Sequence, residues 1–249
     1  MTVIKLQRAE RPADLDADTV TSLTEEFIAN QTSVWNKTYI KERLLQSSGN
    51  KCAYCENNIL EESKYMEVEH FRCKDDFPHL VVEWDNLLPS CKRCNGRKSS
   101  HNVDTEGMIV DPYNDHPPRH MYLQNYRIYW RDELGRNTID TLYLNDTDRM
   151  VLTRMRIGEG IARSLEVIRD TLERYIADDQ RRQLRNRVVR GLEKLLNEAQ
   201  PTSEYSATAA TALLMDQNYR WIKDNLILLD LWGPLAPLEE VAVQGALIP

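Results

Sequence analysis

Two pairs of cysteines constrain this chain more than any other feature of its sequence. Cys52 and Cys55 form one CxxC motif, Cys91 and Cys94 form a second, and 35 residues lie between the two motifs. Each motif supplies two thiolates at the spacing that tetrahedral zinc requires, so the two motifs together fill all four coordination positions. Because no position is left for water or substrate, the pattern predicts a structural zinc site.

The cellular setting favours metal over disulfides for these cysteines. The stretch "MTVIKLQRAERPADLDADTV" lacks the apolar segment of a secretory signal, and no run reaches the roughly 18 apolar residues of a membrane span. We therefore expect a cytoplasmic protein without membrane contact, in which the five cysteines are reduced. In such a protein, paired CxxC motifs indicate metal binding, and Cys73 is expected to be a free thiol outside the zinc site.

The segment between the motifs is longer than in an ordinary zinc ribbon and carries reactive side chains. "YMEVEHF" at 65–71 alternates polar and apolar residues, which predicts a strand that ends with Glu69 and His70 side by side. Adjacent strand residues point to opposite faces, so these two can serve distinct tasks. Asn86 lies shortly before the second motif, and Asn95 follows that motif directly where "CKRCNGRKS" is typical of a helix start.

In this order of elements, residues 51–100 resemble the HNH nucleases of the ββα-metal superfamily, with the triplet His70, Asn86 and Asn95. The resemblance implies an α+β fold, in which a ββα-metal HNH core with a structural zinc on four cysteines lies inside a mostly helical chain. It also implies roles for single residues. His70 would be the general base, and Asn86 would hold the loop that carries it. Glu69, in place of the usual Asp, and Asn95 would bind a catalytic Mg²⁺, for which Mn²⁺ can substitute.

The chemistry of phosphodiester hydrolysis fits these residue types independently. The reaction needs an activated water, which a neutral imidazole can supply, and neutralisation of charge, which a hard cation on carboxylate and amide oxygens can supply. Four basic residues flank the two halves of the site and are expected to hold the scissile phosphate, with a solvated surface as the alternative. These are Arg72, Lys74, Arg97 and Lys98.

A narrower resemblance extends over roughly residues 40–157. "KCAYCE", "VEHFRCK", "EWDNLLPSCKRCNGRKS", "IVDPYND" and "TIDTLYLN" look like the HNH subunit of the Septu anti-phage defence system and related retron-linked HNH proteins. This resemblance implies a metal-dependent endonuclease that attacks invading nucleic acid together with an ATPase partner. DNA is favoured over RNA as the substrate, and tRNA cleavage stays open because of the retron-linked relatives.

The charge of the chain points to dependence on such a partner. The net charge is −7, whereas proteins that bind nucleic acid by themselves are usually basic. Two other classes of protein remain as alternatives, namely a non-catalytic zinc module that binds nucleic acid or protein, and a cytosolic redox or other zinc protein. His70 and Glu69 distinguish the nuclease from a pure zinc module, which needs neither side chain.

Patterning divides the chain into four segments. We expect an extended and helical start at 1–50, the HNH core at 51–107, a strand and β-hairpin extension at 108–145, and a helical region with a tail at 146–249.

Within these segments the expectations are more specific. The hairpin would turn at "DELGRN", and two long helices would occupy 146–198, with further helix at 206–231. The basic run "RRQLRNRVVR" at 181–190 would be a solvated helix face or a contact for nucleic acid or a partner. The tail "PLAPLEEVAVQGALIP" at 234–249 would be irregular, and its apolar end at 241–249 would either fold back or dock on another protein.

Overall fold

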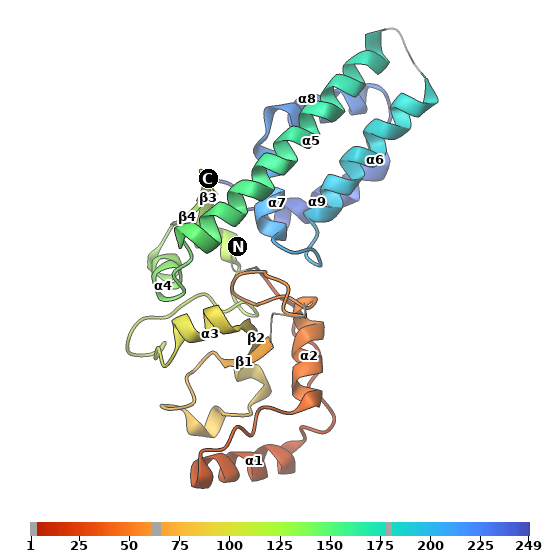
Figure 1. The fold of residues 1–249 in the computed structure, drawn as a ribbon. Coiled ribbons are helices and arrows are strands. Elements are labelled where there is room, and N and C mark those ends of the chain that lie inside the picture. Colours follow the sequence, from red (N-terminus) through yellow and green to blue (C-terminus); the bar gives the residue numbers. More distant parts are fainter. Residues whose placement is uncertain (1–3, 61–65, 178–180) are drawn as a thin grey trace. The chain divides into compact units, whose positions relative to one another are not determined.

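The computed structural model, drawn in Figure 1, describes residues 4–60, 66–177 and 181–249. These residues form two compact units. Of the described residues, the N-terminal unit comprises 4–60, 66–121 and 130–144, and the C-terminal unit comprises 122–129, 145–177 and 181–249. None of the described helices combines the length and the apolar character that crossing a membrane requires.

Two helices open the N-terminal unit, within the segment 1–50 for which the sequence predicts an extended and helical start. Helix α1 (Ala17–Asn30) begins where the side chain of Asp16 accepts a hydrogen bond from the backbone N–H of Thr19. Helix α2 (Thr38–Ser48) ends at Gly49, which takes the left-handed conformation that glycine tolerates. Their apolar faces form one core with the strands that follow. The core includes Leu15, Leu23, Phe27, Ile40, Leu44, Val68, Val81, Val82, Trp84 and Leu87.

A two-stranded sheet followed by a short helix forms the centre of this unit (Figure 1). Strand β1 (Met66–His70) pairs antiparallel with β2 (Leu87–Cys91), so that Glu69 lies opposite Leu88. Helix α3 (Lys92–Lys98) starts directly after β2. The 3₁₀ turns Pro78–Leu80 and Trp84–Asn86 lie between the strands. The ββα arrangement expected from the sequence is confirmed, although Tyr65 lies outside the described residues.

The predicted hairpin around "DELGRN" is wrong, because these residues start a helix. Helix α4 (Glu133–Thr141) begins at Asp132, whose side chain accepts a hydrogen bond from the backbone N–H of Gly135. The chain also leaves no room for a side chain at Gly135, where a Cβ would lie 2.0 Å from a backbone oxygen of His120. The helix cap at Asp132 and the close backbone packing at Gly135 thus outweigh the alternation of polar and apolar residues on both sides of "DELGRN".

The paired strands lie slightly earlier in the chain. Strand β3 (Met121–Gln124) pairs with β4 (Arg127–Trp130), and Asn125 and Tyr126 between them have φ values of 48° and 62°. Two positive φ angles are the mark of the tight turn that matches strand twist. The strand expected at the start of the extension, in "MIVDPYND", is also absent from the described structure, because residues 108–111 join no sheet and 112–114 form a hydrogen-bonded turn.

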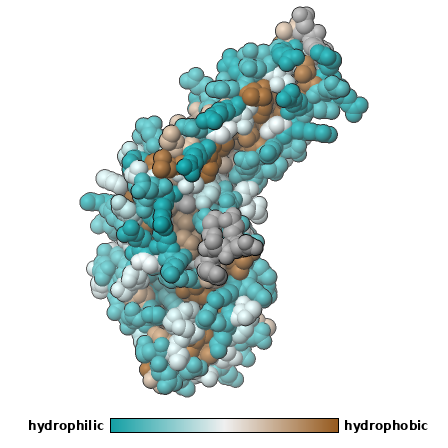
Figure 2. Space-filling view, viewed as in Figure 1, coloured by the Kyte–Doolittle hydropathy of each residue, from teal (hydrophilic) through white to brown (hydrophobic). Residues whose placement is uncertain are grey.

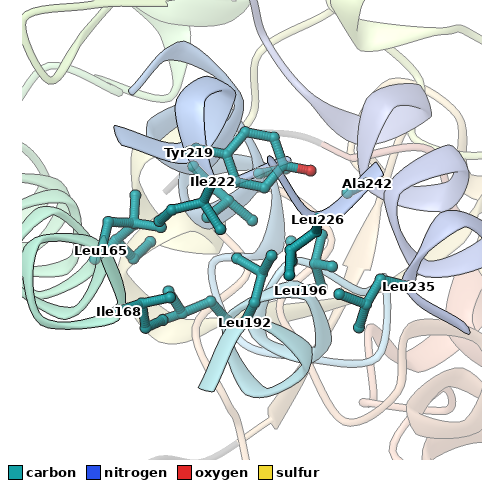
Figure 3. Packing of buried hydrophobic residues seen from close by; sticks show 14 of the residues in the cluster. Leu165, Ile168, Leu192, Leu196, Tyr219, Ile222, Leu226, Leu235 and Ala242 are labelled. Atoms are coloured by element: carbon teal, nitrogen blue, oxygen red, sulfur yellow. The ribbon is translucent and has the colours of Figure 1, made fainter. Parts of the chain in front are cut away.

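The C-terminal unit is a bundle of helices. A short π-helical segment (Thr147–Val151) leads into α5 (Leu152–Ala177), which packs against α6 (Arg182–Glu198), as the sequence predicted. The remaining elements are α7 (Ser206–Met215), α8 (Gln217–Leu228), a 3₁₀ turn (Gly233–Leu235) and α9 (Ala236–Gly245). Figure 3 shows their apolar side chains pointing toward one another, among them Leu165, Ile168, Leu192, Leu196, Ile222 and Leu226.

The C-terminal tail packs on this bundle. Of the two alternatives, folding back and docking on another protein, the structure shows the tail folded back. Most of it belongs to α9, and Leu247 beyond that helix is buried. The backbone N–H of Leu247 donates to Oγ1 of Thr211 at 2.8 Å, and its carbonyl accepts from the backbone N–H of Leu123 at 2.8 Å. The expectation of an irregular tail is wrong, because burial and backbone hydrogen bonding offset the cost of ordering these residues.

Candidate active site

The four cysteines of the two CxxC motifs come together in the N-terminal unit. The sulfur atoms of Cys52, Cys55, Cys91 and Cys94 lie within 4.8 Å of one another, and those of Cys55 and Cys91 are 3.7 Å apart. Zinc with Zn–S bonds of about 2.3 Å separates tetrahedral sulfur ligands by about 3.8 Å, so the cluster fits a zinc ion. Three of the four side chains are buried, which suits a structural metal.

Cys91 links the metal cluster to the start of α3. Its Sγ accepts a hydrogen bond from the backbone N–H of Cys94 at 3.5 Å. Hydrogen bonds from the neighbouring thiols, Cys52 first, together with this backbone donor, lower the pKa of Cys91. Because the thiolate is the form that binds zinc, the surroundings of Cys91 favour metal binding.

His70 lies at the end of β1 with only one ring nitrogen engaged by the backbone. Its Nε2 is 2.8 Å from the carbonyl oxygen of Val81, and the ring of Trp35 meets the imidazole edge-on, with centroids 4.9 Å apart. A carbonyl oxygen only accepts hydrogen bonds, so Nε2 carries the proton and Nδ1 keeps its lone pair. Burial lowers the pKa of His70 to about 4, so the imidazole is neutral at physiological pH.

The side chain of Glu69 lies on the face of β1 opposite to His70, where it contacts α3. Its Oε1 lies 2.8 Å from Nζ of Lys98, and both side chains are buried. Burial raises the pKa of Glu69 to about 7, although the charge of Lys98 opposes this shift. Lys98 also donates a hydrogen bond to the backbone oxygen of His70 at 2.8 Å. Lys98 is therefore not open to a phosphate as predicted, because its ammonium group is enclosed by protein oxygens.

Asn95 is oriented by a carboxylate that the sequence reasoning missed. Its Nδ2 donates a hydrogen bond to Oε2 of Glu67 at 2.6 Å, which turns its Oδ1 away from Glu67. Glu67 precedes Glu69 by two residues, so the alternation of a strand places both side chains on the same face of β1. That spacing was the signal that could have identified Glu67.

Asn86 ties the two ends of the inserted segment together. Its Oδ1 accepts a hydrogen bond from the backbone N–H of Arg72 at 2.8 Å. Its Nδ2 donates to the carbonyl oxygens of Arg72 at 3.0 Å and Leu80 at 3.1 Å. All of its contacts are to backbone of the segment between β1 and β2, which supports the scaffold role expected of it.

A cleft of about 570 Å³ lies beside these side chains. Its lining includes Trp35, Lys41, Glu67, Glu69, His70, Lys74 and Asn95. The oxygens of Glu67, Glu69 and Asn95 are hard ligands of the kind that Mg²⁺ prefers, so the donor set fits such an ion. Trp35 and Lys41 come from the N-terminal helical segment, and no local motif in the sequence marks them as part of the site.

The predicted phosphate contacts are distributed unevenly around the cleft. Lys74 lines it, whereas Arg72 and Arg97 do not. Arg72 forms an ion pair with Asp104. The guanidinium group of Arg97 lies 4.8 Å from the centre of the Tyr143 ring, within the range of a cation–π contact. Lys41 and Lys74 are the positive side chains of the described lining, and Nζ of Lys74 pairs with Oδ1 of Asp75, another lining residue, at 2.7 Å.

Comparison with known proteins relates the region that contains this site to a protein family. The HNH endonuclease family model matches residues 52–101. The Septu protein PtuB of Bacillus thuringiensis is 43% identical over 232 residues, which cover 93% of this chain and 90% of that protein. The Septu protein PtuB of Bacillus mycoides (strain KBAB4) is 27% identical over 48% of this chain and 54% of that protein. No solved structure gives a significant match.

Proposed function

We propose a mechanism for this chain on the premise that it belongs to the Septu PtuB family of HNH proteins. It is an HNH nuclease of anti-phage defence, and hence a phosphodiester hydrolase. The finer proposal is that it cleaves the DNA of the invader at the cleft of the N-terminal unit. The observation that carries the proposal is the lining of this cleft, which combines a neutral histidine with carboxylate and amide oxygens.

In this mechanism His70 activates the attacking water. The hydrogen bond to Val81 holds the imidazole in the tautomer that leaves Nδ1 free to accept a proton. The edge-on contact with Trp35 limits rotation of the ring. Asn86 keeps the segment that follows His70 in place through its backbone hydrogen bonds.

The hard oxygen ligands of the cleft would hold the catalytic cation. Glu69 and Asn95 are the proposed ligands. Glu67 orients Asn95 by accepting a hydrogen bond from the amide nitrogen of Asn95. A bound Mg²⁺ or Mn²⁺ supplies neutralisation of charge on the phosphate and on the leaving oxygen. Lys98 pairs with Glu69 within the protein, and Lys41 and Lys74 in the lining would face the backbone of the substrate. Arg72 and Arg97 would contact phosphates further along the strand.

The structural zinc at Cys52, Cys55, Cys91 and Cys94 would hold the second strand and α3 to the start of the core. It takes no part in the reaction, because four sulfur ligands leave no position for water. The net charge of −7 supports the dependence of binding on an ATPase partner, since phosphate neutralisation dominates affinity for nucleic acid.

The test is cleavage of supercoiled plasmid DNA and of tRNA, each with and without Mg²⁺ and with and without the ATPase subunit. We expect DNA cleavage that needs the cation and is faster with the partner. His70→Ala should reduce the rate by roughly 10²–10⁴-fold at unchanged zinc content. His79→Ala, in the 3₁₀ turn outside the cleft lining, is the matched control and should cleave normally. Cleavage of tRNA alone would reject the DNA substrate, and a fully active His70→Ala protein would reject the mechanism.

A further inference from the structure

A groove of about 640 Å³ runs between α5 and α6 of the C-terminal unit. None of its lining residues also lines the nuclease cleft. On α5 its lining extends from Arg156 to Thr171, and on α6 from Arg187 to Glu198. Figure 2, in the view of Figure 1, shows apolar patches along these two helices with hydrophilic side chains on both sides. The groove plays no part in the mechanism proposed above.

The floor of the groove is apolar, and a glycine in its lining leaves open space. Ile161 and Leu195 belong to the buried core beneath it, while the side chain of Val167 is 54% exposed. Gly160 lines the groove, and a Cβ built there would meet no atom within 4 Å. An exposed glycine in the middle of a long helix costs roughly 1 kcal/mol relative to alanine, so the open space has a cost in stability.

The rim of the groove is basic within an acidic chain. Its charged lining residues are four bases (Arg156, Arg163, Arg187 and Lys194) and one acid (Glu198), which gives a charge of 4 − 1 = +3, against −7 for the chain. Arg163 pairs with Glu159 of its own helix at 3.2 Å. Within the part of the chain that the structure describes, the other three bases form no ion pair or hydrogen bond. Three bases of the rim therefore present positive charge that no described side chain pairs with.

We propose that this groove is a docking site for an acidic amphipathic helix of a partner protein. The lined stretch of α5 is about 22 Å long at 1.5 Å per residue, which matches a helix of about four turns. Apolar side chains at helical spacing would fill the floor, and acidic side chains on both flanks would meet the rim. A nucleic-acid backbone would leave the apolar floor unused, and none of the described lining residues is aromatic, so no ring is offered for base stacking.

The probe is a fluorescent 16-residue helical peptide with leucine at positions i, i+3, i+4 and i+7 and glutamate on both flanks. Its controls are the same peptide with lysine in place of glutamate, and a peptide of equal composition in scrambled order. We expect the acidic peptide to bind the full-length protein, measured by fluorescence anisotropy, and its dissociation constant to rise with salt. Neither control peptide should bind.

Variants locate the contact. Gly160→Trp places a bulky side chain in the groove while removing a helix glycine, so it should keep or raise the melting temperature and weaken peptide binding by about tenfold or more. Glu166→Trp, on α5 but outside the groove lining, is the matched control and should bind normally. Arg156→Glu with Arg187→Glu should abolish binding of the acidic peptide and allow binding of the lysine peptide.

Three results would overturn the proposal. Equal binding of all three peptides would mean that the groove does not select an acidic helix. A concentration-dependent dimer that Gly160→Trp dissociates would assign the groove to a second copy of this chain. Competition of the peptide by an oligonucleotide, with loss of oligonucleotide binding in the charge-reversed variant, would assign it to nucleic acid. The readout is binding, so its outcome is separate from whether DNA hydrolysis is demonstrated.

Discussion

Lys98 and Glu69 form a buried ion pair in which Nζ of the lysine lies 2.8 Å from Oε1 of the glutamate. The pair joins α3 to the last residues of β1, next to the proposed general base. Because burial raises the pKa of Glu69 to about 7 in spite of Lys98, the carboxylate is only partly stabilised in the absence of a metal ion. The lysine thus acts on the site through Glu69 and through the backbone oxygen of His70.

Removing Lys98 should destabilise the protein through the charge that it leaves behind. Lys98→Met would bury a carboxylate without a partner, and we expect a loss of about 3 kcal/mol in the free energy of unfolding at pH 8. Glu69→Gln combined with Lys98→Met should recover most of that loss. Urea unfolding of the wild type, both single variants and the double variant measures the coupling. Losses that simply add would show that the two side chains do not interact.

The four-cysteine cluster should hold one zinc ion per chain, independently of the fifth cysteine. Cys91→Ser should lower the zinc content and the melting temperature together, because metal binding and folding are linked. Cys73→Ser is the matched control, since the Cys73 thiol donates to Asp76 and lies outside the cluster. Elemental analysis and calorimetry measure both quantities. Full zinc content in Cys91→Ser would mean that the cluster is wrongly assigned.

Glu67 should affect the affinity for the catalytic cation more than the chemical step. Glu67→Ala would release the amide of Asn95, and we expect the Mg²⁺ concentration for half-maximal cleavage to rise by roughly 10-fold or more, as for other residues that orient a ligand. Glu67→Gln keeps an oxygen acceptor for Asn95 and should restore most of the affinity. The maximal rate at saturating Mg²⁺ should change little. A rate that stays low at saturation would make Glu67 a direct participant.

Stability should fall in acid partly because of His70. Its pKa is about 4 in the folded protein and about 6.5 in the unfolded chain, so the unfolded chain takes up the proton first as the pH falls. Stability contributed by the neutral ring is present above pH 6.5 and is lost between pH 6.5 and pH 4, and it amounts to about 2 kcal/mol by pH 5.

The measurement compares the wild type with His70→Gln, which cannot titrate. The free energy of unfolding of the wild type should drop more steeply between pH 7.5 and pH 5 than that of the variant. Glu69, whose pKa is raised, acts in the opposite direction between about pH 4.5 and pH 7. It is present in both proteins, so the difference between them isolates His70. Parallel pH profiles would contradict the lowered pKa.

Local sequence patterns were sufficient to predict the zinc ligands, strand β1 and the long helices α5 and α6. The spacing within and between the CxxC motifs predicts four sulfur ligands, because the tetrahedral geometry of zinc allows few arrangements. The alternation in β1 and the apolar periodicity of α5 and α6 predict elements that the structure contains, since each pattern follows from the repeat of one element. The hairpin predicted at "DELGRN" failed because it relied on a local alternating pattern. The cap at Asp132 and the packing of Gly135 outweigh that pattern, and the residues form α4.

Contacts between residues far apart in the sequence could not be predicted and became visible in the folded chain. The tautomer of His70 depends on the carbonyl of Val81, and the environment of Glu69 depends on a lysine at the end of α3. The position of the tail depends on hydrogen bonds that Leu247 donates to Thr211 and accepts from Leu123, both far away in the sequence. In each case the physical reason is burial, since a polar group removed from water must find a partner wherever the fold brings one. A local sequence pattern does not indicate which residue will be the partner of a buried polar group.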